Sequence, residues 1–329
     1  METHSLTTAL RSVSNHLDRN PGQALNLDWV MSAQANTSAI ERRTSTLSTR
    51  RSVKKSHQAA WLLRAVSCID LTSLSGDDTE GRVYRLCDKA KTPIRADILG
   101  QLDFPKIRVG AVCVYHDMIK AAVTRLQGSG IPVVAVSTGF PAGLSPLELR
   151  IAEIKESVSC GADEIDIVIN RKAFFEGDYK KVYEEIKALK DVCGEIHLKT
   201  ILEIGELKTY ENIKKASVIA LCAGSDFIKT STGKISNGSS REACLIMART
   251  VREFESYGYG MRGIKVAGGI RDAKDAIRYL VIINEELGGS WLSADYFRFG
   301  ASSLLDDVLK QIKKLKTNAY QSSYYFPRG

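Results

Sequence analysis

The sequence predicts an α/β fold: a closed (β/α)8 barrel, or TIM barrel, with an N-terminal extension and a short C-terminal tail. From residue 57 onward, short apolar runs alternate with longer amphipathic stretches. Such alternation implies parallel strands joined by right-handed crossovers, and eight units in roughly 250 residues suit a closed barrel. The chain has 329 residues, of which 44% are hydrophobic and 26% charged. This composition excludes a disordered chain, a fibre and a disulfide scaffold.

The strands are expected, in chain order, at Ser67–Thr72, Ile107–Tyr115, Val133–Phe140, Glu164–Asn170, His197–Gly205, Asp226–Thr232, Gly263–Ile270 and Phe297–Gly300. Helices are expected between them, among others at Leu147–Ser159, Tyr179–Val192, Lys208–Ala223, Arg241–Tyr257 and Ala273–Glu286. An open, doubly wound sheet is the alternative. The sequence has no G-x-G-x-x-G motif after the first strand, which disfavours the dinucleotide-binding form of that sheet.

Segments of different composition flank the barrel. Residues 1–56 are rich in Ser, Thr and Arg and have weak apolar periodicity, so we expect a basic extension that is at best partly ordered. Residues 57–316 are assigned to the barrel. Residues 317–329 form a tail too short to be a domain, with tyrosines at Tyr320, Tyr324 and Tyr325.

Charge and cysteine content restrict the partners. The net charge is +8, and the first 56 residues hold eight basic and four acidic residues. The remainder is nearly balanced, which disfavours a nucleic-acid-binding face. Seven cysteines without a C-x-x-C pair predict a reduced, cytoplasmic compartment, although the Arg- and Ser-rich N-terminus also has some features of a mitochondrial transit peptide. The histidines form no metal-binding motif, and no apolar run could span a membrane.

Side-chain alternation along the strands places charged residues inside the barrel. In the fourth strand three isoleucines share the face suited to the helix layer, so Asp166 points inward. The same alternation places Lys199 and Glu203 on the inner face of the fifth strand. It places Lys229 and Lys265 inward on the sixth and seventh strands. The interior is therefore expected to hold three lysines and two carboxylates.

Buried charges are costly unless they are paired. A structural ion pair between Lys199 and Glu203 is the simpler interpretation of Lys199. Lys229 and Lys265 instead precede Gly-rich turns at the C-terminal ends of neighbouring strands, where barrel enzymes hold their active sites. An amine beside another amine has a lowered pKa, and a neutral amine can attack a carbonyl. Either lysine could be that nucleophile, and the spacing does not choose between them.

Three Gly-containing turns predict a phosphate site. Gly233-Lys234 follows the sixth strand, and Gly268-Gly269 follows the seventh. A run from Gly300 to Ser303 ends the eighth strand and opens a helix. Loops at these places, together with a helix N-terminus, form the usual phosphate site of such barrels. Each turn taken alone would also fit an ordinary tight turn.

Five segments resemble segments of the deoxyribose-phosphate aldolases: DFIKTSTGK at 226–234, IKVAGGIR at 264–271, ADEIDIVIN at 162–170, CIDLTSL at 68–74 and FRFGASS at 297–303. The resemblance runs in order from about residue 58 to about residue 316. Residues 54–55 and 59–63 are similar to the longer forms of that family. Two departures are visible. Ala267 stands where many bacterial members have Ser. Bacterial members commonly end in a tyrosine whose tail reaches the site, whereas here four residues follow Tyr325, so the resemblance does not extend to a role of this tail.

The resemblance implies a role for each site residue. Lys229 would form a Schiff base, Lys265 would lower its pKa and serve a proton relay, and Asp166 would be the carboxylate of that relay. Asp70 and Thr72 would contact substrate hydroxyls and ordered water. The substrate phosphate would be surrounded by Gly233, Lys234, Gly268, Gly269, Arg271, Gly300, Ser302 and Ser303.

The function implied is that of a class I aldolase in deoxyribose phosphate catabolism. It would cleave 2-deoxy-D-ribose 5-phosphate reversibly to D-glyceraldehyde 3-phosphate and acetaldehyde, without a metal or other cofactor. Two alternatives stay open: another imine-forming aldolase that acts on a different phosphorylated sugar, and a binding role of the basic extension toward RNA or a protein. The sequence does not fix the oligomeric state, and a homo-oligomer is compatible with it.

Overall fold

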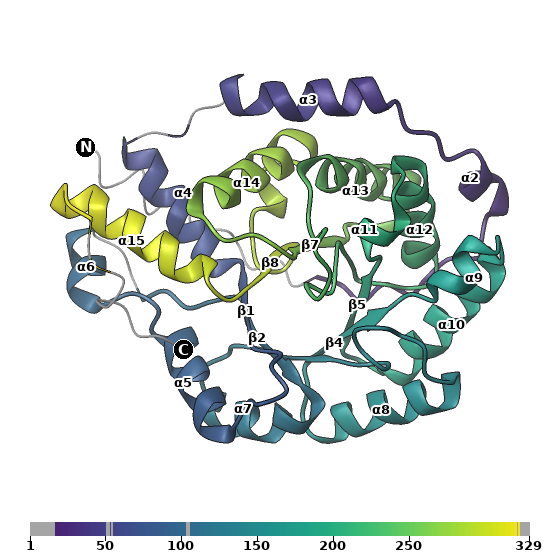
Figure 1. Ribbon diagram of the computed structural model, residues 1–329, viewed down its shortest axis with the longest axis horizontal. Coiled ribbons are helices and arrows are strands. Elements are labelled where there is room, and N and C mark those ends of the chain that lie inside the picture. The colour runs from purple at the N-terminus through teal and green to yellow at the C-terminus, as the bar shows by residue number, and fades with distance from the viewer. Residues whose placement is uncertain (1–16, 51–52, 54, 103–105, 321, 323–329) are drawn as a thin grey trace.

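Eight parallel strands close into a barrel in which each strand pairs with its neighbours in the sequence and β1 pairs with β8. The computed structural model describes residues 17–50, 53, 55–102, 106–320 and 322 (Figure 1). The strands are β1 (Ile69–Thr72), β2 (Ala111–Tyr115), β3 (Val133–Val136), β4 (Glu164–Val168), β5 (His197–Ile201), β6 (Phe227–Lys229), β7 (Gly263–Ala267) and β8 (Phe297–Ala301). The closed barrel confirms the predicted fold class, and the open sheet is excluded.

Several strands end earlier than the apolar pattern predicts, because the backbone turns sharply at their C-terminal ends. After β3, Thr138 and Gly139 both adopt a φ of 68°. After β5, Glu203 lies in the left-handed region with a φ of 58°, and after β7 Gly268 has a φ of 93°. A strand cannot continue through a positive φ, so these residues mark where the chain leaves the sheet for the loops above it.

Helices surround the barrel. They are α2 (Leu27–Met31), α3 (Thr37–Arg50), α4 (Lys55–Ser67), α5 (Glu80–Lys91), α6 (Ala96–Gln101), α7 (Ile119–Leu126), α8 (Leu147–Ser159), α9 (Arg171–Phe175), α10 (Tyr179–Val192), α11 (Ile204–Leu207), α12 (Tyr210–Cys222), α13 (Arg241–Phe254), α14 (Ala273–Leu287) and α15 (Leu304–Thr317). Short turns of other helix types occur at His116–Met118, Glu255–Tyr259 and Gly289–Trp291. The bounds of α8 and α10 are those that the sequence predicts.

The main hydrophobic core lies between the strands and the helices. Outward-facing strand residues such as Ile165 and Ile167 are completely buried there, while Asp166 between them points into the barrel. This division follows from the two-residue period of a strand. The aliphatic layer holds the barrel in shape, and the inner face is left for the charged residues described below.

The described part of the extension packs on the outside of the barrel domain (Figure 1). Helix α2 lies against α12, and α3 runs along α13 and α14. The segment before them passes the N-terminal ends of β6 and β7: the Asn20 backbone N–H donates to Asp226, 2.6 Å away, and Arg262 donates to the Asp18 carbonyl at 3.1 Å. Residues 1–16 lie outside the described part of the chain. The division of the chain at residue 56 stays a prediction.

Among the described residues, none of the helices combines the length and the apolar character that crossing a bilayer requires.

Candidate active site

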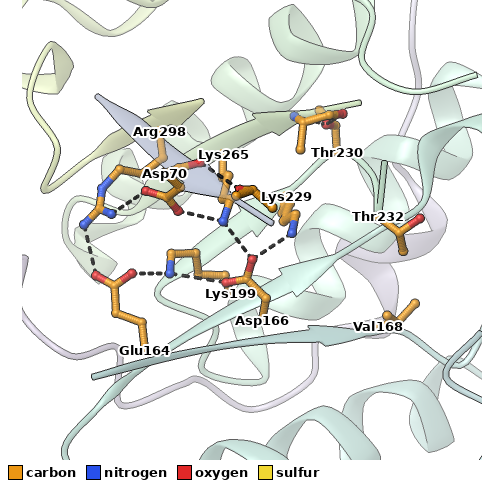
Figure 2. Close-up of polar contacts among 12 residues, drawn as sticks. Asp70, Glu164, Asp166, Val168, Lys199, Lys229, Thr230, Thr232, Lys265 and Arg298 are labelled. Atoms are coloured by element: carbon orange, nitrogen blue, oxygen red, sulfur yellow. Dashed lines mark hydrogen bonds and ion pairs between the residues drawn. The ribbon is translucent and has the colours of Figure 1, made fainter. Parts of the chain in front are cut away.

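Charged side chains from six strands meet inside the barrel (Figure 2). All are almost completely buried, since the most accessible of their side chains is 6% exposed. They are Asp70, Glu164, Asp166, Lys199, Lys229, Lys265 and Arg298. The structure thus brings together Asp166 and the three lysines, as the strand alternation predicts.

Asp166 is the centre of this cluster. Its Oδ2 accepts hydrogen bonds from Lys229 Nζ at 2.7 Å and from Lys265 Nζ at 2.8 Å. Its Oδ1 lies 3.3 Å from Lys199 Nζ. The register explains the convergence, because Lys229 lies beside Lys265 on neighbouring strands and Asp166 lies beside Lys199. One carboxylate is therefore shared by three amines.

The predicted pair between Lys199 and Glu203 does not form. Lys199 instead donates to Glu164 and faces Asp166. Glu203 is beyond the end of β5, where its left-handed backbone carries it away from the inner face of the strand. Its carboxylate accepts from the Thr232 N–H, 3.3 Å away. The strand period fails for Glu203 because the strand has already ended.

Asp70 and Thr72 lie on β1. Asp70 is completely buried, with its Oδ2 2.6 Å from Lys265 Nζ and its Oδ1 accepting from Arg298 at 2.6 Å. The Thr72 hydroxyl donates to the Asp70 carbonyl at 2.7 Å and remains partly accessible. Asp70 is thus a counter-ion of Lys265. The contact of both residues with substrate hydroxyls or water stays a prediction.

Glu164 and Arg298 were not singled out by the sequence patterns. Arg298 Nη2 donates to Glu164 Oε1 at 3.0 Å, inside the barrel. A signal was present, because Glu164 is two residues before Asp166 and therefore shares its inward face. Arg298 in turn lies beside Lys265 in the register of β7 and β8.

The pKa values of the two candidate nucleophiles move in opposite directions. Burial lowers the pKa of Lys229, and the positive charge of Lys265 lowers it further, against the opposing effect of Asp166. Burial also acts to lower the pKa of Lys265, but the carboxylates of Asp166 and Asp70 outweigh it and raise that pKa above its ordinary value. Lys229 is thus the amine better suited to lose its proton.

The carboxylates stay ionised. Burial acts to raise the pKa of Asp166, but Lys229, Lys265 and Lys199 together hold it well below its usual range. Burial has the same effect on Asp70, where Lys265 and Arg298 outweigh it and lower the pKa. Asp166 is therefore a hydrogen-bond acceptor for both neighbouring amines rather than an acid in the resting site.

The predicted phosphate-site residues lie at the C-terminal rim of the barrel. A Cβ placed on Gly233 would lie 3.9 Å from the Gly268 Cα, so the turns after β6 and β7 adjoin. Lys234 is exposed. Its Nζ donates to the carbonyl of Leu74, in the turn after β1, at 2.5 Å. The other rim residues reach solvent to differing degrees: Gly269, Arg271, Ser302 and Ser303 are exposed, and Gly300 is partly buried.

One of these rim residues has a feature that suits an anion, and another is constrained by packing. Ser303 precedes α15 without capping it through its side chain, which leaves the first N–H groups of that helix unoccupied by a side-chain cap. Gly300 is also a close packing position, because a Cβ there would lie 2.8 Å from Ala267 Cβ and 3.1 Å from Lys265 Cε. Phosphate binding by the rim stays a prediction.

The C-terminal tail is only partly described. Tyr320 is 62% exposed, and its hydroxyl accepts from Lys314 Nζ at 2.7 Å. Tyr324 and Tyr325 lie outside the described residues. Within the described part of the chain, no group of three or more His, Cys, Asp and Glu side chains is arranged to hold a metal ion.

Comparison with known proteins identifies the family. The profile of the "DeoC/LacD family aldolase" matches residues 64–310. The chain belongs to this aldolase family. It is 48% identical to the mouse "Deoxyribose-phosphate aldolase" over 310 residues, which cover 93% of this chain and 98% of the mouse protein. The family assignment makes the protein a lyase and makes the interior charge cluster its candidate catalytic centre.

Two solved structures are similar in fold. The crystal structure of "a putative deoxyribose-phosphate aldolase" from Coccidioides immitis matches with a TM-score of 0.61 and 25% identity, covering 83% of this chain and 98% of the other. The deoxyribose phosphate aldolase from Aeropyrum pernix, described as having a "unique tetrameric structure", matches with a TM-score of 0.57 and 23% identity. It covers 87% of this chain and all of the other, and at this identity it shows the fold alone.

Proposed function

We propose that this aldolase cleaves 2-deoxy-D-ribose 5-phosphate reversibly to D-glyceraldehyde 3-phosphate and acetaldehyde through a Schiff base on Lys229. One observation carries the proposal: a buried amine of lowered pKa shares the Asp166 carboxylate with a second, charged amine. The similarity to the mouse enzyme over nearly the whole chain supports the choice of substrate.

The first step needs a neutral amine. Lys229 ends β6 at the C-terminal side of the barrel, where substrates of such barrels bind. Its lowered pKa increases the fraction of free base at neutral pH. The free amine attacks the aldehyde carbon C1, and loss of water gives a protonated imine. The positively charged imine then withdraws electrons from the bond between C2 and C3.

The second step needs a proton acceptor for the C3 hydroxyl. Asp166 Oδ2 lies 2.8 Å from Lys265 Nζ. Asp166 also accepts from Lys229, and Lys265 lies beside Lys229 on the neighbouring strand, so the two residues together can pass a proton through one water molecule. Cleavage releases D-glyceraldehyde 3-phosphate and leaves an enamine. Protonation of the enamine at C2 and hydrolysis of the new imine release acetaldehyde and restore Lys229.

The rim positions the substrate in this proposal. The phosphate is held by Lys234, the glycine turns after β6, β7 and β8 and the N-terminus of α15. The interior amine and the exposed rim are then two ends of one binding site. A phosphate fixed at the rim aligns the aldehyde with the amine, and such alignment accelerates reaction.

The cellular setting is also a proposal. All seven cysteines are free thiols in the structure, which suits the reduced cytoplasm. There the enzyme would serve the breakdown of deoxyribose phosphate. Assembly into a homo-oligomer stays a prediction.

Product analysis tests the proposed reaction. The purified protein should release acetaldehyde and D-glyceraldehyde 3-phosphate from 2-deoxy-D-ribose 5-phosphate, detected by coupled dehydrogenase assays. Lys229→Arg serves as the inactive control. If the protein leaves this substrate intact and releases dihydroxyacetone phosphate from another phosphorylated sugar, the substrate assignment is wrong.

A further inference from the structure

Six of the interior charges form a closed ring in which cations and anions alternate (Figure 2). In order around the ring they are Asp70, Lys265, Asp166, Lys199, Glu164 and Arg298. Lys229 lies outside the ring and contacts it through Asp166 alone among the ring members. The ring has equal numbers of positive and negative charges, so protonation of Lys229 would add an unmatched charge.

The phenyl group of Phe227 packs beside two cations of this ring of charges. The Phe227 ring centroid lies 5.6 Å from Lys199 Nζ and 5.9 Å from Arg298 Cζ. Gly263 makes room for it, because a Cβ there would come within 2.3 Å of the phenyl ring. An apolar side chain against these two cations keeps water from replacing their ion pairs, so the contacts within the ring control where each charge goes.

We propose that Glu164 and Arg298 are positioning residues for the aldol chemistry, because they close the ring and set how strongly Lys199 interacts with Asp166. This inference rests on the proposed Schiff base at Lys229. Lys199 stands between two carboxylates: it donates to Glu164 and lies 3.3 Å from Asp166. Arg298 in turn occupies the other oxygen of Glu164, at 3.0 Å. Any change at Glu164 or Arg298 therefore shifts Lys199 toward or away from Asp166.

The two residues should act in opposite directions. Without the charge of Glu164, Lys199 has Asp166 as its one anionic partner and interacts with it more strongly. Asp166 then stabilises the Lys229 ammonium less, and the pKa of Lys229 falls. Without Arg298, Glu164 binds Lys199 more strongly, and the interaction of Lys199 with Asp166 weakens. Asp166 then stabilises the Lys229 ammonium more. The pKa of Lys229 then rises. A merely structural role would weaken the fold without this opposition of sign.

Trapping of the imine with borohydride in the presence of acetaldehyde gives the readout. The trapping rate at Lys229 is measured against pH for the wild type, Glu164→Gln, Arg298→Met and the double variant, together with kcat for the cleavage reaction. Glu185→Gln is the matched control, because Glu185 forms a buried ion pair with Arg150 at 2.7 Å on the outer helices. Circular dichroism verifies that each variant folds.

We expect the acid limb of the trapping profile to move to lower pH in Glu164→Gln and to higher pH in Arg298→Met, by roughly half to one pH unit. The double variant restores equal charge numbers in the ring, and its acid limb should return toward the wild type. Each single variant should also lose roughly tenfold in kcat, less than the hundredfold or more expected for loss of a general acid or base. Glu185→Gln should change neither quantity.

Acid limbs that stay in place, or that move in the same direction in both single variants, would overturn the inference while trapping at Lys229 still upheld the proposed function. Absence of any trapped lysine in the wild type would overturn the proposed function itself. If one single variant does not fold, the other single variant and the double variant still give two limbs to compare with the wild type.

Discussion

Charged side chains are buried and paired in the barrel interior, whereas those at the barrel rim are exposed to solvent. In the interior, charged side chains are buried and bound to one another, so each pKa is decided by its neighbours. At the rim, Lys234, Arg271 and Ser302 are exposed, and the turns between them are rich in glycine. The interior is suited to change the chemistry of an amine, and the rim is suited to hold an anion that arrives from solvent. Changes in the two regions should therefore fail in different ways.

Loss of the proposed interior nucleophile should have the largest effect. Lys229→Arg keeps a positive charge beside Asp166 but cannot form an imine. We expect kcat to fall by about a thousandfold or more, as for removal of other covalent nucleophiles, while the fold is retained. Steady-state kinetics and circular dichroism give the two readouts. Substantial remaining turnover would contradict the role of Lys229.

Asp166→Asn removes the centre of the ion-pair cluster. Loss of the proposed proton relay should lower kcat by roughly 10² to 10⁴. It also leaves three amines short of one anion, and breaking buried pairs in this way costs about 3–5 kcal/mol in the free energy of unfolding. Urea unfolding at pH 7 measures that loss. A variant as stable as the wild type would show that the pairs do not hold the interior together.

The same variant tests the pH dependence of stability. The folded-state pKa values of Asp166 and Asp70 are lowered, so their contribution is present above the ordinary Asp pKa of about 4 and is lost as pH falls through the folded values. Asp166→Asn should flatten this acid loss, which unfolding curves between pH 7 and pH 2 would reveal. An equally steep acid loss would assign the effect to other carboxylates.

Lys265→Leu separates electrostatics from proton transfer. Removal of its charge lets the pKa of Lys229 rise, so the imine step needs a higher pH. Each unit of that rise corresponds to roughly 1.4 kcal/mol. We expect a large loss of kcat at neutral pH with partial recovery on the alkaline side. A flat loss would indicate proton transfer alone, and an unchanged profile would remove Lys265 from the mechanism.

Lys234→Ala tests the rim and has the smallest expected effect. Loss of one charged hydrogen bond, worth about 1.5–3 kcal/mol, should lower kcat/KM for the phosphorylated sugar by roughly ten- to a hundredfold, mainly through KM. The unphosphorylated sugar should be affected much less. Lys187→Ala, at an exposed position on α10, is the control. Equal losses for both sugars would count against a phosphate role.

The interior could be predicted from the sequence because the strand period is rigid. Asp166, Lys229 and Lys265 follow from alternation alone. The same alternation also places Glu164 on the inner face, because it is two residues before Asp166. It was not predicted, because the flanking isoleucines marked Asp166 alone. The rule failed at Glu203, because a left-handed residue ends the strand and no local sequence signal showed where.

The pairing inside the barrel was not predictable, because it depends on which strands face each other across the interior. Arg298 on β8 and Glu164 on β4 belong to strands that are not neighbours in the sheet, and yet they hydrogen-bond at 3.0 Å. The strand pattern likewise left the choice between Lys229 and Lys265 open, and at the sequence level only the family resemblance favoured Lys229. In the structure, the positions of Asp70 and Asp166 show which amine is better able to keep its proton. At the rim, the three glycine turns and the general rule for barrel loops predicted a phosphate site, and the family resemblance supplied its individual residues.

Reductive trapping identifies the lysine that forms the imine. The protein is treated with borohydride in the presence of acetaldehyde, digested, and mapped by mass spectrometry for ethylated lysines. We predict that Lys229 carries the label and that Lys199 and Lys265 do not, because their amines are committed to ion pairs with two carboxylates each. A label on Lys265 or Lys199, with Lys229 unmodified, would show that Lys229 is not the nucleophile.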